Sequence, residues 1–367
     1  MTERMKNDET VMQGLRKLYR KYGYSQFKMS KFEEYDTYVQ NKDFLISDKV
    51  ITFTDTNGKL LAMKPDVTIS IIKNSDDTEP GVKKLYYNEN VYRVSAGAHA
   101  FREIMQAGLE CIGAVDTYSI CEVIMLAAKS LNVISDSFVL DISHMGYVSG
   151  LIDAAGFSAK EKAAVLLAIG EKNLPQLVSI CKEKHLSEDM TWKITGLITV
   201  YGPIRDVAKR LSEGCVNEET EKAAEEMRTL CEVLEQNGLA DHVQIDFSVV
   251  NDMNYYNGIV FRGYVEGIPT GILSGGQYDK LMEKMGKTSK ALGFAVYLDL
   301  LERLQENGDG FDVDVLLTYD DTVSVAEVFQ EASALTDSGK SVLVVTAAPE
   351  MLKYREKIIM TKGGTAK

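Results

Sequence analysis

Two polar side chains at an even spacing, Gln106 and Glu110, are the clearest candidates for chemistry in the sequence. They lie in the segment 102–113, whose alternation is typical of a β-strand. Successive side chains of a strand point to opposite faces, so a spacing of four places both on the same face. A carboxylate beside an amide suits a ring such as imidazole, which offers one hydrogen-bond donor and one acceptor. The alternative is that Glu110 pairs with an arginine of the sheet.

Three other short segments carry residues that could contact a ligand. Gly275 and Gly276 allow a backbone to approach a ligand closely, although such a pair is also typical of a β-bulge. Tyr255 and Tyr256 offer an aromatic wall and a hydroxyl group, but on a strand they face opposite ways, so one is expected to pack in the core. Arg93 either serves binding or balances the charge of nearby carboxylates. Each feature has an ordinary structural explanation, and only their combination indicates a site.

The overall charge argues against free nucleic-acid binding. The chain has 367 residues and a formal net charge of −13, without a run of lysines and arginines. An acidic protein repels a polyanion at long range, and nucleic-acid-binding domains usually show a basic patch. We therefore do not expect tRNA as a partner.

The cysteines and histidines lack the spacing of a metal site. The five cysteines are scattered without a CxxC pair, which predicts reduced thiols in a cytoplasmic protein. His99 and His144 are interpreted as surface or hydrogen-bonded core groups. The charged N-terminus lacks the apolar region of a signal peptide, and no apolar run is expected to span a bilayer. Neither a metal nor a cofactor is expected.

Local signals place these residues on a framework of strands and helices. Apolar side chains recur at helical spacing over 11–22, and Gly23 marks the end of this helix. Asn57-Gly58 between two β-rich runs predicts a hairpin, and Pro65 predicts the first turn of another helix. The pattern further predicts paired strands in 83–95 and 102–113, a helix over 116–131 and a strand over 137–143.

Composition changes at about residue 157. Charged amphipathic segments without strand signals dominate 157–239, which predicts a helical insertion. The β character returns afterwards, so 1–156 and 240–307 are expected to form one core, an α+β fold with an antiparallel sheet flanked by helices. Residues 311–367 are expected to add a small α/β unit, with a strand, a helix at 322–338, a second strand and a polar tail.

Four ordered blocks resemble the histidyl-tRNA synthetases of class II. KPDVT at 64–68 is similar to their segment that holds the α-amino group of the amino acid, and 91–113 is similar to motif 2, a strand-loop-strand that cradles ATP and substrate. The segment 249–261 resembles the histidine-specific segment, and 274–301 resembles a glycine-rich strand followed by motif 3. The likeness covers roughly residues 5–307 and implies the class II synthetase fold.

The resemblance implies that the amino-acid pocket is kept. Asp66 and Thr68 would meet the α-ammonium group of a ligand. None of the pocket residues is expected to be catalytic. The full set expected to bind histidine is Asp66, Thr68, Arg93, Gln106, Glu110, Tyr255, Tyr256, Gly275 and Gly276.

Four positions depart from the synthetase pattern at expected ATP contacts. Ser95 stands where the family has a glutamate, and Asn251, Gln277 and Leu300 stand where it has arginines. Adenylation builds negative charge that oriented cations stabilise, and losing one oriented donor costs about 100- to 1,000-fold in rate. Arginine also binds phosphate through a planar fork that asparagine or glutamine cannot replace. These losses imply a protein that binds histidine without activating it.

This combination resembles the regulatory subunits of ATP phosphoribosyltransferase, the glycosyltransferase of the first step in histidine biosynthesis. That resemblance implies an allosteric, histidine-sensing subunit that activates a short catalytic subunit, as a homodimer within a hetero-oligomer. Class II cores dimerise through motif 1, here around Phe27–Tyr38, where Ser30 stands in place of the usual proline. The alternatives are a divergent, active histidyl-tRNA synthetase and a synthetase-like protein with another tRNA-associated role.

Overall fold

The computed structural model describes residues 8–41, 50–75, 81–94, 100–249, 256–301, 311–362 and 364–366. The chain splits into a large unit, Lys6–Glu302, and a small unit that includes Arg303–Lys367. Each unit is described by itself. Four positions singled out in the sequence lie outside the described residues: Ser95, His99, Asn251 and Tyr255.

The large unit is built on a sheet whose described strands follow the order β1-β5-β6-β12-β11-β10-β7-β9-β8. Most neighbours are antiparallel, and only the pairs β1–β5 and β7–β9 among these strands are parallel. The α+β class is therefore confirmed. The strands are β1 (Ser25–Gln26), β5 (Val82–Val94), β6 (Phe101–Gly113), β12 (Lys290–Tyr297), β11 (Leu273–Gln277), β10 (Ile259–Val265), β7 (Phe138–His144), β9 (Val243–Ile245) and β8 (Gly202–Pro203).

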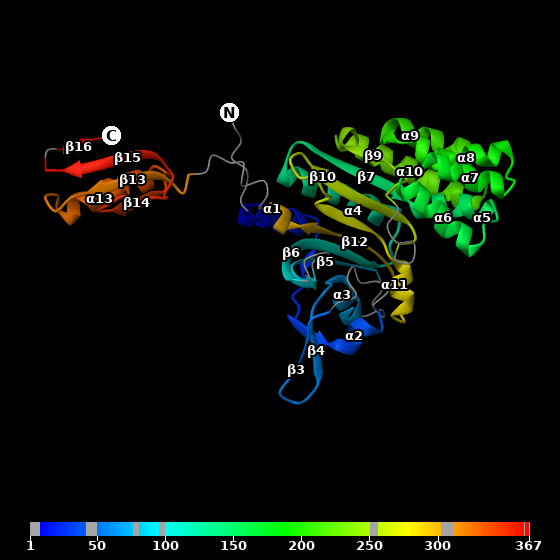
Figure 1. Cartoon of the computed structure of the whole chain (residues 1–367), viewed down its shortest axis with the longest axis horizontal. Helices are drawn as coiled ribbons and strands as arrows, with labels where there is room; N and C mark the ends of the chain where they lie inside the picture. The colour runs from blue at the N-terminus through cyan, green and yellow to red at the C-terminus, as the bar shows by residue number, and fades with distance from the viewer. Residues whose placement is uncertain are drawn as a thin grey trace. The chain divides into compact units, whose positions relative to one another are not determined.

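Helices α1 (Asp8–Lys21) and α4 (Thr117–Ile134) pack together against one face of this sheet (Figure 1). Tyr19 of α1 makes an edge-to-face contact with Phe294 of β12, with ring centroids 6.1 Å apart. Both helices were predicted, and Gly23 adopts the positive φ of 82° expected after the first. This face is therefore a closed hydrophobic layer.

Helix α4 is long and apolar enough to cross a membrane by length and composition, contrary to the expectation that no such run exists. In the structure 61% of the helix is buried inside the protein. It contacts β7, β10 and β12. Its apolar composition is thus accounted for by its place in the core.

On the other face, α3 (Thr68–Asn74) and α11 (Asp279–Lys284) share a hydrophobic cluster with the sheet. Helix α3 begins at Thr68, three residues later than Pro65 predicted; Val67 is its N-cap residue, and Asp66 before it accepts the backbone N–H of Ile69 at 3.0 Å. A second small sheet, in the order β2-β4-β3, joins this side, and its hairpin turns at Gly58 as predicted. Its elements are β2 (Phe32–Glu34), α2 (Tyr35–Val39), β3 (Thr52–Thr54) and β4 (Leu60–Met63).

A cluster of helices follows β7 in the chain, and Figure 1 shows it gathered beside β7 and β9. Capping boxes fix the starts of α6 and α10, since Ser158 and Asn217 each bond the third residue of their helix reciprocally. The helices are α5 (Met145–Ala154), α6 (Ala159–Gly170), α7 (Leu174–Glu183), α8 (Glu188–Thr199), α9 (Ile204–Arg210) and α10 (Glu218–Gln236), with a 3-10 turn η2 (Leu211–Gly214) before α10.

The small unit contains a parallel β13-α13-β14 arrangement, as predicted. The segment expected to be a polar tail instead forms two further strands, so that expectation was wrong. Strand β15 lies parallel to β13 and buries Ile358, because its apolar residues alternate toward the core of this unit. The elements are β13 (Val313–Tyr319), α13 (Val325–Asp337), β14 (Val342–Val345), β15 (Tyr354–Thr361) and β16 (Gly364–Ala366).

Candidate functional site

Strand β6 presents Gln106 and Glu110 on one face of the sheet, as their spacing predicted. In the register with β12, Gln106 lies opposite Tyr297 and Glu110 lies opposite Gly293. Both polar side chains are buried, with 3% and 2% of their surface exposed. Two buried polar groups on a sheet require partners, so their neighbours decide what this face can do.

The carboxylate of Glu110 accepts two hydrogen bonds from hydroxyl groups. Thr68, at the start of α3, donates to Oε1 at 2.8 Å, and Tyr278, immediately before α11, donates to Oε2 at 2.5 Å. Burial raises the pKa of Glu110 to about 8, although both hydrogen bonds favour the ionised form. The carboxyl group is therefore poised to change its protonation near neutral pH. The alternative pairing of Glu110 with an arginine is not what the structure shows.

The absence of a side chain at Gly293 creates the space that Glu110 occupies. A Cβ atom at this position would lie 1.7 Å from Oε2 of Glu110 and 2.5 Å from the carbonyl oxygen of Leu109. The second atom belongs to the backbone of the neighbouring strand and cannot turn aside. Gly293 thus lets the sheet close beneath the carboxylate.

Asp66 and Arg93 form a second polar group of the predicted set. Arg93 Nη2 lies 3.7 Å from Asp66 Oδ2, and its Nε donates to the carbonyl oxygen of Pro65 at 2.9 Å. Burial raises the pKa of Asp66, an effect that the Arg93 guanidinium opposes. Arg93 therefore balances the charge of Asp66, which is one of the two roles considered for it from the sequence.

Gln106 has an unused hydrogen-bond donor. Its Nε2 atom is buried and has no partner among the described residues. Buried polar groups without partners are rare in folded proteins, and leaving one unpaired costs about 1–3 kcal/mol. An acceptor on a bound ligand would satisfy this amide.

The two glycines of β11 face opposite ways. A Cβ on Gly276 would meet the ring of Tyr256 at 2.6 Å, whereas one on Gly275 would meet Phe294 and Phe261, with closest approaches of 2.4 and 2.8 Å. Gly276 therefore admits Tyr256, and Gly275 lets β11 pack against the aromatic layer beneath the helices. Burial raises the pKa of the Tyr256 hydroxyl, so this group stays protonated. Histidine binding by these positions stays a prediction.

Gln277, which stands where the synthetase pattern has an arginine, does not lie on the face that carries Glu110. It follows Gly276 on β11, and the alternation of the strand turns it toward α4 and α10, where it lines a pocket of about 530 Å³. Its Nε2 donates to Asp279 Oδ2 at 2.7 Å. A side chain at position 277 points away from the Glu110 carboxylate, so an arginine there would not place a cation beside it.

The remaining positions have structural roles or no assigned contact. His144 is buried, and its Nε2 lies 3.0 Å from Glu226 Oε2, in agreement with its interpretation as a hydrogen-bonded core group. Leu300 is half-buried in the 3-10 turn η4 (Leu298–Leu301) that follows β12.

Tyr278 is a site residue that the sequence-based prediction missed. Tyr278 lies two residues after Gly276. A tyrosine so close to the glycine pair was the feature of the sequence that could have indicated its role. Its contact with Glu110 joins residues 168 positions apart. Only the register of β11, β12 and β6 brings them together.

Comparison with known proteins gives consistent results. Residues 1–301 match the family described as histidyl-tRNA synthetase. An ATP phosphoribosyltransferase regulatory subunit from Clostridium kluyveri is 31% identical over 337 residues, covering 89% of this chain and 85% of that protein. A second from Acetivibrio thermocellus is 29% identical over 83% of this chain and 75% of that protein.

Solved structures show the same architecture. The structure of an ATP phosphoribosyltransferase regulatory subunit/histidyl-tRNA synthetase from Bacillus halodurans has a TM-score of 0.77 at 26% identity, covering 96% of this chain and 94% of that chain. The class II synthetase-like fold is thereby confirmed. From the extent and identity of these matches, the chain belongs to the ATP phosphoribosyltransferase regulatory subunits, within the wider histidyl-tRNA synthetase family.

Proposed function

We propose that this chain is a non-catalytic regulatory subunit that binds histidine on the sheet face around Glu110 and transmits its binding to a catalytic ATP phosphoribosyltransferase subunit. The names of its relatives support the regulatory role. The partner is a short catalytic chain, and the regulatory chain acts as a homodimer within the hetero-oligomer. The pair of Gln106 and Glu110 is the observation that carries the choice of ligand.

The chemistry of this pair suits an imidazole ring. An imidazole N–H donates to a carboxylate, and the second ring nitrogen accepts from an amide N–H. Glu110 supplies the acceptor, and the unpartnered Nε2 of Gln106 supplies the donor. With a pKa of about 8, Glu110 shares one proton readily with a ring that titrates in the same range.

The same face offers little to stabilise a transferring phosphoryl group. Arg93 is already engaged with Asp66 and the Pro65 carbonyl oxygen. Gln277 faces the helices, and an apolar side chain stands at Leu300. Activation of an amino acid by ATP depends on oriented cations, so we expect no adenylation.

Regulation requires that histidine bind two states of the complex with different affinity. The Glu110 site lies between α3, α11 and the sheet, so a ligand there touches elements from three parts of the chain. A small displacement of α3 or α11 on binding is the proposed signal to the catalytic subunit.

Calorimetric titration of the full chain with histidine, alone and with its catalytic subunit, tests this function. We expect saturable binding, and a loss of about 10- to 100-fold in affinity for Glu110→Gln, since an amide cannot take up or release the proton that Glu110 shares with the imidazole ring. A matched control is Glu266→Gln, at an exposed carboxylate of the same chain. The absence of heat with and without the partner would contradict histidine sensing.

A second measurement separates regulation from catalysis. Histidine-dependent exchange of pyrophosphate into ATP reports the adenylate. We expect no exchange above the background of a chain-free reaction. Measurable turnover by the purified chain would establish the rival, an active divergent histidyl-tRNA synthetase.

A further inference from the structure

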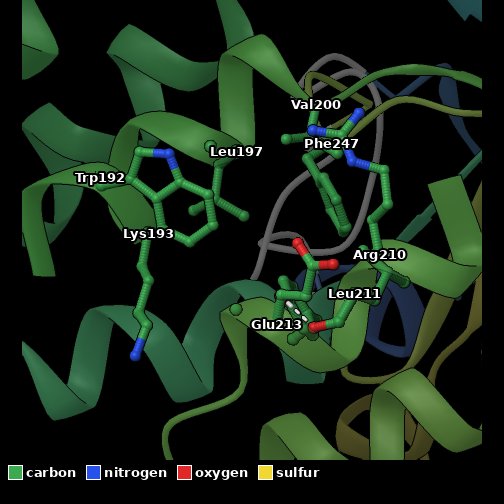
Figure 2. Close-up of a pocket in the computed structure, with 11 residues that line it drawn as sticks. Trp192, Lys193, Leu197, Val200, Arg210, Leu211, Glu213 and Phe247 are labelled. Atoms are coloured by element: carbon green, nitrogen blue, oxygen red, sulfur yellow. Dashed lines mark hydrogen bonds between the residues drawn. The ribbon is translucent and has the colours of Figure 1, made fainter. Parts of the chain in front are cut away.

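A second pocket lies where α8 and the η2 turn meet the first turn of α5 and the segment after β9, away from Glu110 (Figure 2). We call it the Trp192 pocket. Its floor is a pair of stacked rings, Tyr147 and Phe247, with centroids 5.3 Å apart and planes at 18°. The Tyr147 hydroxyl donates to the Leu211 carbonyl oxygen at 2.8 Å, and a Cβ on Gly214 would lie 2.2 Å from that hydroxyl. The floor is therefore rigid and already formed.

The wall of the pocket is an indole ring that the fold leaves open to solvent. Trp192 on α8 is 53% exposed, although it is the single tryptophan of the chain. One turn later on the same helix, Gly196 leaves the pocket open, since a Cβ there would meet only Val200 at 3.9 Å. Packing does not require a glycine at this position. The helix thus offers an aromatic surface and free space beside it.

Three charged side chains line the pocket, Lys193, Arg210 and Glu213, and the one that points into the space beside the indole is the Glu213 carboxylate. Figure 2 shows the Glu213 carboxylate pointing toward the space between the indole of Trp192 and the ring of Phe247, while the ammonium group of Lys193 points away. Lys193 is paired with Asp189 at 3.0 Å. Glu213 has no hydrogen-bond or ion-pair partner among the described residues. A carboxylate beside one exposed aromatic face, here the indole of Trp192, is an arrangement suited to binding an organic cation.

We infer that the Trp192 pocket is a docking site for an arginine side chain of a partner polypeptide. The guanidinium group stacks on the indole and pairs with Glu213, and its aliphatic stem covers Leu197 and the Gly196 gap. A cation–aromatic contact with an exposed ion pair gives a gain of about 3- to 30-fold in affinity. That gain is too small to retain a free metabolite at cellular concentrations, but it is the size of one hot spot in a protein interface, where tryptophan, tyrosine and arginine are enriched.

Because Trp192 is the only tryptophan in the sequence, its fluorescence reports this pocket directly. The full chain is titrated with a blocked Leu-Arg-Leu peptide and with the same peptide carrying neutral citrulline. We expect a saturable change in emission below about 50 mM arginine peptide, and at least about fivefold weaker binding of the citrulline peptide. Equal affinity for the two peptides, or no saturable change, overturns the inference.

Three variants keep the fluorescent residue and separate charge from shape. Glu213→Gln is expected to weaken arginine-peptide binding about two- to fivefold, and Arg210→Gln, at the rim, to strengthen it by removing a like charge. Gly196→Leu fills the open space and is expected to abolish binding with unchanged far-UV circular dichroism. Stronger arginine-peptide binding by Glu213→Gln together with weaker binding by Arg210→Gln would reverse the expected charge preference and overturn the inference. Histidine titration of each variant stays unchanged, which keeps this test independent of the Glu110 site.

Discussion

The Glu110 site and the Trp192 pocket each centre on a carboxylate, yet the two carboxylates behave differently. Glu110 is 2% exposed and accepts hydrogen bonds from Thr68 and Tyr278. Glu213 is exposed and has no partner among the described residues. The first group has a pKa raised by burial to about 8, because the sheet removes it from water.

The fold holds the Glu110 carboxylate in place before any ligand binds, whereas it leaves the Glu213 carboxylate unfixed. At Glu110, three segments distant in sequence lock one group, so any change there disturbs folding and binding together. At Glu213, the rings beneath are fixed but the charge is free, so changes alter binding alone.

Gly293→Ala is expected to destabilise the fold by about 3 kcal/mol or more, because its methyl group meets the Leu109 carbonyl oxygen at 2.5 Å as well as the Glu110 carboxylate. Urea unfolding followed by circular dichroism measures the loss. Gly196→Ala is the matched control, since only Val200 lies near, at 3.9 Å. That variant is expected to gain up to about 1 kcal/mol from helix propensity. Equal stability of the two variants would contradict the contrast.

Glu110→Gln is expected to change how stability depends on pH. The pKa of Glu110 is raised in the folded state, so its ionisation opposes folding, and its contribution is full below about pH 4.5 and is lost as pH rises toward about 8. Relative to the parent, the variant gains up to about 1.4 kcal/mol per pH unit across this window. Denaturant midpoints at several pH values measure this slope. Parallel pH profiles for variant and parent would show that Glu110 is ionised throughout.

Tyr278→Phe removes one donor to Glu110 and is expected to cost about 2 kcal/mol, since the acceptor is a buried carboxyl group. Tyr147→Phe removes a neutral bond to the Leu211 carbonyl oxygen and is expected to cost about 1 kcal/mol. Histidine titration distinguishes them further, because only the first variant should weaken binding. A greater loss of histidine affinity in Tyr147→Phe than in Tyr278→Phe would contradict the placement of the histidine site at Glu110.

Glu213→Gln is expected to change the free energy of unfolding by less than about 0.5 kcal/mol, because the side chain is exposed and unpartnered among the described residues. Urea unfolding followed by circular dichroism measures this change. A loss of more than about 1 kcal/mol would reveal a structural role for Glu213.

Local patterns were enough to predict most elements of the fold. The even spacing of Gln106 and Glu110 was sufficient to place them on one face, and Asn57-Gly58 was sufficient to predict a hairpin. Such features depend on backbone periodicity and on conformations that few residues adopt, so they can be inferred from neighbours in the chain. The start predicted at Pro65 was wrong, since the helix begins at Thr68 after the N-cap residue Val67.

The sequence by itself determined the type of fold, the family resemblance and the candidate residues of the amino-acid pocket. Only the tertiary structure decided which of them meet. It joined Tyr278 to Glu110 across 168 positions and turned Gln277 to the opposite face. It also left Trp192 open above the stacked rings of Tyr147 and Phe247. The physical reason is that strand register and helix packing fix contacts between distant segments, and no local pattern encodes a register.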